Sequence, residues 1–223
     1  MFLEVIAKSK QDVIDINDSL ANRIELCKDL EVGGLTPPYD LIDEVTSISK
    51  IPVNVIVRPS SNSFVYSKAE KKQILEDIKF ITSTKASGIV FGALTSKNNI
   101  DIKFLKKVLK FKKNLTITFH KAFDEVNNFT KSYKKLNSLE IDYILTSGGL
   151  DLETGLKVID LLVNLNLKTK ILIGGGINNN NISHAYSISN YIHIGRLARV
   201  NNSWDQKIDK QKINAICKIK LEK

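Results

Sequence analysis

The feature that most constrains the fold of this chain is a regular alternation of short strand-like runs with helical periods. Eight runs rich in apolar residues have the length and pattern of strands, at residues 2–7, 23–27, 52–58, 88–92, 115–120, 143–146, 170–173 and 191–194. Helical periods lie between and after them, at residues 10–19, 38–48, 68–83, 101–112, 128–138, 152–164, 179–187 and 205–220. Such alternation implies parallel strands joined by right-handed crossovers. The pattern therefore predicts an α/β fold of the (β/α)₈ TIM-barrel type, in one domain covering residues 1–223.

A doubly wound open sheet is the alternative architecture for alternating strands and helices. It usually carries a GxGxxG turn after the first strand, and the segment that follows Ala7 contains no glycine. The clearest single helix begins after Ser67, which together with Glu70 forms the sequence signature of a capping box. The barrel therefore remains the better interpretation.

The formal charge of +9 raises the question of a nucleic-acid partner. Several lysines lie at helical spacing on one face of residues 101–112, and apolar residues occupy the other face. This is the pattern of an ordinary solvated helix surface. Because no recognition motif and no interleaved aromatic residues accompany the lysines, we expect no nucleic-acid partner.

The cysteine content and the apolar runs indicate the compartment. Cys27 and Cys217 are far apart in the sequence, so a disulfide framework is not expected and a reducing cytosol fits. Residues 1–20 lack the charged segment and apolar run of a signal peptide, and no apolar stretch has the length of a membrane span. We expect a cytoplasmic protein with no membrane partner.

Three side chains with chemical potential share one face of the second predicted strand: Arg23, Glu25 and Cys27. In a barrel this face points inward, where charged groups are costly unless they are paired or wetted. Two interpretations follow, a buried ion-pair layer that joins Arg23 to Glu4 or Glu25, and the polar floor of a pocket. Cys27 alone is typical of a small buried apolar residue, and as a nucleophile it needs a base such as His120 that only the fold can bring close.

Barrel enzymes place their functional groups at the carboxyl ends of the strands. Arg58 ends the third strand, where a guanidinium can hold a carboxylate or phosphate or can pair with a neighbouring strand. His120 ends the fifth strand and is a candidate general acid or base. Asp124 follows one short turn later, and either orients His120 or caps the next helix.

Glycines follow the seventh and eighth strands, where barrel enzymes often bind phosphate through backbone N–H groups. The glycines also serve simply as tight turns. We predict an anion or substrate site at this end of the barrel, and His193 lies at the same end. Its candidate binding residues are Arg23, Arg58, Ser147, Gly175, Gly176, Gly195 and Arg196.

The order of these motifs resembles the CutC family over nearly the whole chain. The resemblance rests on RIELC at 23–27, GGLTP at 33–37, VRP at 57–59, VFGALT at 90–95, FHKAFD at 119–124, LTSGG at 145–149 and GGGI at 174–177. It implies a TIM barrel, a cytoplasmic location, a homodimer or larger homo-oligomer, and a role in copper homeostasis through copper binding. Copper is thus the cofactor or cargo that the resemblance implies, with Cys27 as its ligand.

Two departures from the family pattern bear on copper. Family members commonly carry a cysteine in the first strand where this chain has Ile6, and Lys121 replaces an arginine in the histidine motif. Cu(I) prefers thiolate or thioether ligands, and Cys27 has lost that partner. The alternative is therefore a barrel enzyme or binder in which Glu25, Arg58, His120 and Asp124 act on a small phosphorylated or carboxylated metabolite.

Overall fold

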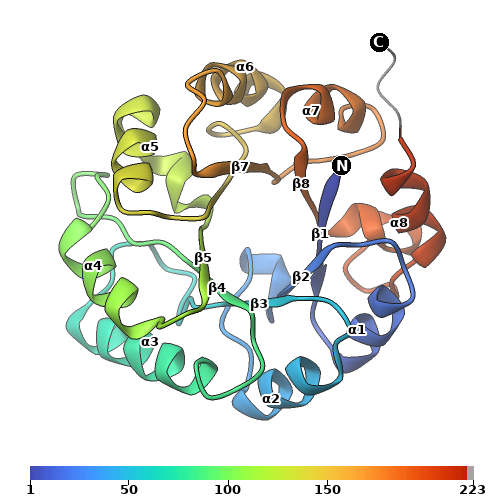
Figure 1. Ribbon diagram of the computed structural model, residues 1–223, viewed down its shortest axis with the longest axis horizontal. Coiled ribbons are helices and arrows are strands. Elements are labelled where there is room, and N and C mark those ends of the chain that lie inside the picture. The colour runs from blue at the N-terminus through green and yellow to red at the C-terminus, as the bar shows by residue number, and fades with distance from the viewer. Residues whose placement is uncertain (220–223) are drawn as a thin grey trace.

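The computed structural model describes residues 1–219 and contains eight parallel strands that close into a barrel (Figure 1). Each strand pairs with the next along the chain, and the last pairs with the first, where Glu4 lies opposite His193. The predicted TIM-barrel fold is confirmed. The strands are β1 (Phe2–Ala7), β2 (Arg23–Leu26), β3 (Val53–Ile56), β4 (Gly88–Phe91), β5 (Thr116–Phe119), β6 (Tyr143–Thr146), β7 (Lys170–Ile173) and β8 (Tyr191–Ile194).

Helices form a ring around the barrel (Figure 1). They are α1 (Lys10–Asn17), α2 (Tyr39–Ile48), α3 (Lys68–Ile81), α4 (Ile102–Phe111), α5 (Phe129–Ser138), α6 (Leu152–Val163), α7 (Ile182–Ile188) and α8 (Lys210–Cys217). Short 3₁₀ turns lie in the loops that follow β2, β5 and β8: η1 (Leu30–Val32), η2 (Lys121–Glu125), η3 (Arg196–Ala198) and η4 (Val200–Asn202). None of the helices in residues 1–219 is both long enough and apolar enough to cross a membrane.

Helix α3 begins as its sequence predicts. The hydroxyl of Ser67 accepts the backbone N–H of Glu70, and the Glu70 carboxylate accepts the backbone N–H of Ser67. Helix α4 buries its apolar face, including Phe104, Leu105 and Val108, and turns its lysines outward. Both observations agree with the local sequence pattern.

The last helix begins later than predicted, at Lys210 instead of residue 205. Ile208 bridges to Arg199 in an antiparallel contact, which holds the preceding segment in extended form. The Asp209 carboxylate then accepts the backbone N–H groups of Gln211 and Lys212 and starts the helix. Residue 220, the predicted end of this helix, lies outside the described residues.

The strands separate two packed layers. Their outward faces are apolar and pack under the helices, as Val5, Val55 and Ile117 do with no exposed surface. Inside the barrel, towards the carboxyl ends of the strands, lies a smaller apolar cluster of Cys27, Leu30, Ile56 and Val90. Towards the amino-terminal ends of the strands lies a layer of buried charged and polar side chains. This layer forms the base on which the candidate site is built.

Candidate functional site

A cavity of about 770 Å³ opens among the residues that directly follow the strands. Its floor includes Glu25, Cys27 and His193, and its walls include Arg58, His120, Lys121, Gly175, Gly176, Gly195, Arg196 and Trp204. These positions mark the carboxyl end of the barrel, where TIM-barrel proteins place their sites. Of the predicted site residues, Arg23, Asp124 and Ser147 do not line the cavity.

Cys27 directly follows β2 and is 2% exposed. Burial raises the pKa of its thiol well above the usual value, and the nearby charge of Glu25 raises it further. Cys217 lies at the other end of the barrel, where its thiol contacts the carbonyl of Leu20, in the loop that precedes β2. The two thiols are both free, so Cys27 is the single thiol of the cavity.

His193 bridges two buried carboxylates inside the barrel. Its Nδ1 lies 2.8 Å from Oε1 of Glu4, and its Nε2 lies 3.4 Å from Oε2 of Glu25. Arg23 contacts the other oxygen of Glu4, with Nε 2.5 Å from Oε2. The two interpretations of this strand face, a buried ion-pair layer and a polar pocket floor, therefore both apply. Arg23 and Glu4 form the buried ion pair, and Glu25 lies in the pocket floor.

The protonation of this network follows from its contacts. Burial alone would raise the pKa of Glu4, but Arg23 and His193 outweigh it and lower that pKa to about 2. Glu25 lacks a direct partner of comparable strength, and burial raises its pKa to about 7. Burial opposes charge on His193, yet the charges of Glu25 and Glu4 raise its pKa overall. Both raised pKa values favour the protonated forms of Glu25 and His193 as pH approaches neutrality.

The same three residues have the arrangement of a metal site, since one donor atom of each of Glu4, Glu25 and His193 lies within 4.8 Å of the others. However, Arg23 already neutralises Glu4, and His193 uses both ring nitrogens on the carboxylates. A cation here would compete with both groups. The network is better described as a cluster of buried ion pairs beneath the pocket, in which Arg23 and His193 balance the two carboxylates.

The structure corrects the anion-binding role predicted for Arg23. Its guanidinium is packed between two aromatic rings, 5.0 Å from the centroid of Phe2 and 4.1 Å from that of Tyr143. These rings belong to the amino-terminal end of the barrel, opposite the cavity. Arg23 therefore closes the base of the barrel and does not face a ligand.

Arg58 lines the cavity, but most of its guanidinium is occupied. Nη1 donates to the carbonyls of Val32 at 2.9 Å and Gly34 at 3.3 Å, and Nη2 donates to that of Ser61 at 3.4 Å. Arg58 thereby fastens the loops after β2 and β3 to each other. Its buried Nε has no hydrogen-bond partner within residues 1–219, so this donor is left unsatisfied.

His120 packs against Phe64, with ring centroids 4.8 Å apart, and is 4% exposed. Its Nδ1 accepts the backbone N–H of Ala122 at 3.1 Å, which assigns the proton of the neutral ring to Nε2. Burial, together with the charge of Arg58, lowers the pKa of His120 to about 3. The lowered pKa favours a neutral ring, and with Nδ1 occupied by Ala122 these contacts favour a hydrogen-bond donor at Nε2 over the predicted general acid or base.

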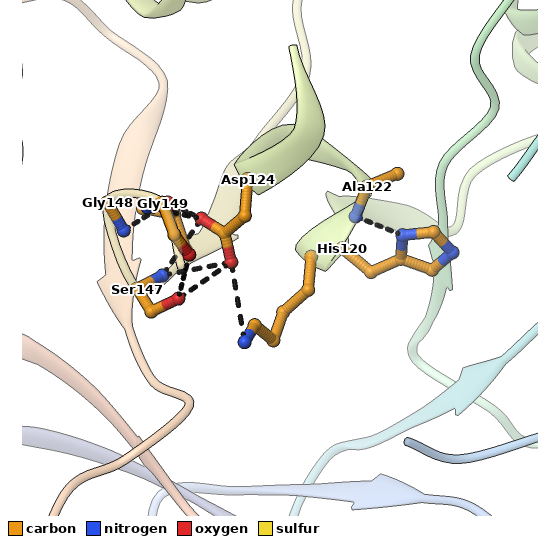
Figure 2. Close-up of polar contacts among 8 residues, drawn as sticks. His120, Ala122, Asp124, Ser147, Gly148 and Gly149 are labelled. Carbon is orange, nitrogen blue, oxygen red and sulfur yellow. Dashed lines mark hydrogen bonds and ion pairs between the residues drawn. The ribbon is translucent and has the colours of Figure 1, made fainter. Parts of the chain in front are cut away.

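Asp124 neither orients His120 nor caps the next helix, contrary to both predicted roles (Figure 2). Its carboxylate accepts the backbone N–H of Ser147 at 3.1 Å, the Ser147 hydroxyl at 2.9 Å, and the Thr146 hydroxyl. The cap of α5 is Asn128. Asp124 instead anchors the loop after β6. Ser147 uses its hydroxyl and its backbone N–H in this contact and has no exposed surface, so it is not available to a ligand.

The predicted glycine loops after β7 and β8 do meet at the cavity. Gly175 and Gly176 have φ values of 85° and 122°, which favour glycine, and the side chain of Lys121 lies directly over Gly175. A Cβ added at Gly195 would lie 2.1 Å from the ring of Trp204, so the glycine makes room for this indole. Arg196 is exposed at the mouth of the cavity.

Sequence reasoning missed two contributors to the site. Trp204 lies in an irregular segment with no periodic signal, and it reaches the cavity because Arg199 ties that segment to α1 through a buried ion pair with Asp12. The bridging of Glu4 by His193 depends on the closure of β8 onto β1. The sequence indicated Glu4 as a candidate partner of Arg23 and placed His193 at the pocket end of the barrel, but it gave no sign that the two side chains meet.

These features define a TIM-barrel protein with a ligand-sized pocket at the carboxyl ends of its strands and one buried thiol in the pocket floor. The family model of CutC, described as "CutC family", matches residues 1–196. A family protein CutC from Bacteroides fragilis is 35% identical over 184 residues, which are 80% of this chain and 72% of the relative. The chain belongs to the CutC family.

Solved structures agree with this assignment. A CutC from Streptococcus agalactiae, described as a candidate copper homeostasis protein, superposes with a TM-score of 0.82 at 30% identity, covering 87% of this chain and 98% of that one. Thiamine phosphate pyrophosphorylase from Pyrococcus furiosus has a TM-score of 0.64 at 14% identity, covering 97% of this chain and 94% of that one. The second likeness concerns the fold alone.

Proposed function

We propose that this protein serves copper homeostasis by binding one Cu(I) ion in its barrel pocket through the thiolate of Cys27. The family membership supports the biological role, as does the description of the S. agalactiae relative. The observation that carries the proposal is the place of Cys27, a soft ligand in the floor of the pocket next to Glu25.

The donor set fits a single Cu–S bond with coupled loss of a proton. A thiol binds metal as the thiolate, so the raised pKa of Cys27 makes Cu(I) binding weaker at low pH. Glu25 lies on the same strand face as this thiol and has a pKa of about 7, which suits it to receive the proton. His120 is not a second ligand in this arrangement, because its Nδ1 lone pair is used by Ala122.

The test is a Cu(I) titration under non-thiol reducing conditions against a competing chelator. We expect one ion per chain in the natural protein and in the matched control Cys217→Ser, since Cys217 lies at the opposite end of the barrel. We expect at least a tenfold loss of affinity in Cys27→Ser. Equal affinity in the two serine variants would refute the proposal.

A second candidate function is the binding of a small carboxylated or phosphorylated metabolite. It is favoured by the size of the cavity, about 770 Å³, which falls in the range of small-molecule sites and far exceeds the needs of one ion. A thermal-shift screen of small anions tests it, because a ligand of the folded state raises its melting temperature. A screen that yields no stabilising anion would count against this function.

The family membership also supports a cytoplasmic location and a homodimer or larger homo-oligomer. Analytical ultracentrifugation of the natural protein tests the second point. A monomer at micromolar concentration would overturn it.

A further inference from the structure

We infer that the pocket takes Cu(I) together with a small thiol that carries carboxylate groups, whose sulfur supplies the second ligand of the metal. This inference rests on the proposed Cu(I) site at Cys27. It joins three features that a bare ion leaves unexplained: the missing second thiol, the volume of the cavity, and the unsatisfied donors of its wall with the exposed cation Arg196 at its mouth.

The pocket floor offers too few soft ligands for Cu(I) on its own. Cys27 is the single thiol there, and Ile6 beside it is apolar. Glu25 and His193 are hard or borderline donors that are engaged with each other. Because Cu(I) prefers sulfur, a second sulfur from outside the chain completes the coordination better than any described side chain of the pocket.

The cavity has room for such a molecule, and its mouth carries the complementary charge. Lys121 and Arg196 line the mouth beside the glycine loop of β7. Arg196 is exposed, whereas Lys121 is half-buried and its Nζ lies 3.5 Å from Oδ2 of Asp124. Glu31 is the acidic residue at the mouth, in η1 on the β2 side. A thiol whose sulfur meets Cys27 would therefore direct its carboxylates towards Arg196, while Lys121 shares its charge with Asp124.

Two buried donors in the cavity wall point to the same ligand chemistry. Nε of Arg58 and Nε2 of His120 have no hydrogen-bond partner in the part of the chain that the structure describes, although both residues are more than nine-tenths buried and line the cavity. Both atoms carry hydrogens, so each lacks an acceptor. A carboxylate or carbonyl oxygen would supply one.

The transfer is a ligand exchange that leaves copper as Cu(I). In a bis-thiolate complex of the small thiol, one Cu–S bond breaks, and a new Cu–S bond forms to Cys27. The proton of the Cys27 thiol passes to the departing thiolate, which leaves as a neutral thiol group. The complex carries the same charge before and after, and no oxidant or reductant takes part.

Equilibrium dialysis of the whole protein with Cu(I) tests the inference, using three probes. Mercaptosuccinate has a thiol and carboxylates, succinate lacks the thiol, and mercaptoethanol lacks the carboxylates. We expect one mercaptosuccinate to be retained per bound copper, with at least tenfold tighter retention than mercaptoethanol. Retention should vanish without copper and in Cys27→Ser, and succinate should not be retained.

Variants at the mouth of the cavity distinguish recognition of the carboxylates from coordination of the second sulfur. Arg196→Gln should weaken retention of mercaptosuccinate at least threefold without changing that of mercaptoethanol, whereas Lys107→Gln on the outer face of α4 should change neither. Copper bound with no thiol retained would overturn the inference and leave the Cu(I) site intact. Equal retention of the two thiols would overturn the carboxylate recognition. Copper affinity unaffected by Cys27→Ser would overturn the proposed function itself.

Discussion

The Nε2 atom of His193 lies 3.4 Å from Oε2 of Glu25, so the floor of the pocket is coupled to the charged layer beneath it. Through its other nitrogen His193 contacts Glu4, which is held by Arg23. A change of protonation at the pocket floor is thereby felt at the base of the barrel. The following predictions start from this network and from the loops above it.

Stability should fall as pH rises above about 6.5. Between pH 4.5 and 6.5 two groups oppose each other, because the pKa of His120 is lowered to about 3 and the unfolded chain therefore binds a proton at His120 that the folded protein does not. Between its ordinary pKa of 4.5 and its folded value of about 7, Glu25 holds a proton that the unfolded chain has lost, so rising pH favours unfolding. The raised pKa of His193 has the same sign, because its contribution is complete below 6.5 and is lost as pH rises through the folded pKa. Each group contributes at most about 1.4 kcal/mol per pH unit.

Urea unfolding at pH 5, 6, 7 and 8 measures this slope. Glu25→Gln removes the titrating carboxyl, so the free energy of unfolding of the natural protein should decrease relative to that of the variant as pH rises from 5 to 7. Parallel pH profiles for the two proteins would contradict the assignment.

Replacing Arg23 by Gln should destabilise the barrel much more than it changes the pocket. The change leaves the Glu4 carboxylate buried without its ion-pair partner, which typically costs about 3–5 kcal/mol. Chemical denaturation measures the loss, and adding Glu4→Gln should recover part of it. Because Arg23 contacts no group of the cavity directly and acts on it only through Glu4 and His193, copper affinity should fall far less than in Cys27→Ser. A loss of affinity as large as that of Cys27→Ser would contradict its placement.

Replacing Asp124 by Asn should loosen the loop after β6. The carboxylate accepts several hydrogen bonds from Thr146, Ser147 and Gly149, and charged hydrogen bonds are worth about 1.5–3 kcal/mol each. We expect a loss of at least about 2 kcal/mol, against almost none for the exposed control Asp205→Asn. If Asp124 oriented His120 instead, Asp124→Asn would shift the His120 ring signals in NMR spectra while leaving stability almost intact.

Replacing Gly195 by Ala should displace Trp204. The added Cβ would come within 2.1 Å of the indole, and overpacking of this kind typically costs about 1–3 kcal/mol. Trp204 is the single tryptophan of the chain, so intrinsic fluorescence reports its displacement directly. An unchanged emission spectrum would show that the ring does not lie against Gly195.

The sequence by itself determined the barrel. The capping box of Ser67 and Glu70 and the alternating face of Arg23, Glu25 and Cys27 are local signals, and local periodicity decides which side of a strand or helix is buried. Eight such units leave few topologies open, so the fold and the end of the barrel that carries the pocket could both be predicted. Helix starts such as Lys210 were less certain, because Asp209 and the Arg199–Ile208 bridge set that boundary together.

Only the tertiary structure decided which partner each polar group takes. Asp124 is four residues from His120 in the sequence, yet its carboxylate faces Ser147, because the loop after β6 supplies more donors at closer range. The Nη groups of Arg58 donate hydrogen bonds to loop carbonyls. Arg23 points to the opposite end of the barrel from Cys27. Hydrogen bonds and ion pairs depend on ångström distances between strands that are far apart in the chain, whereas the pattern that builds those strands is local.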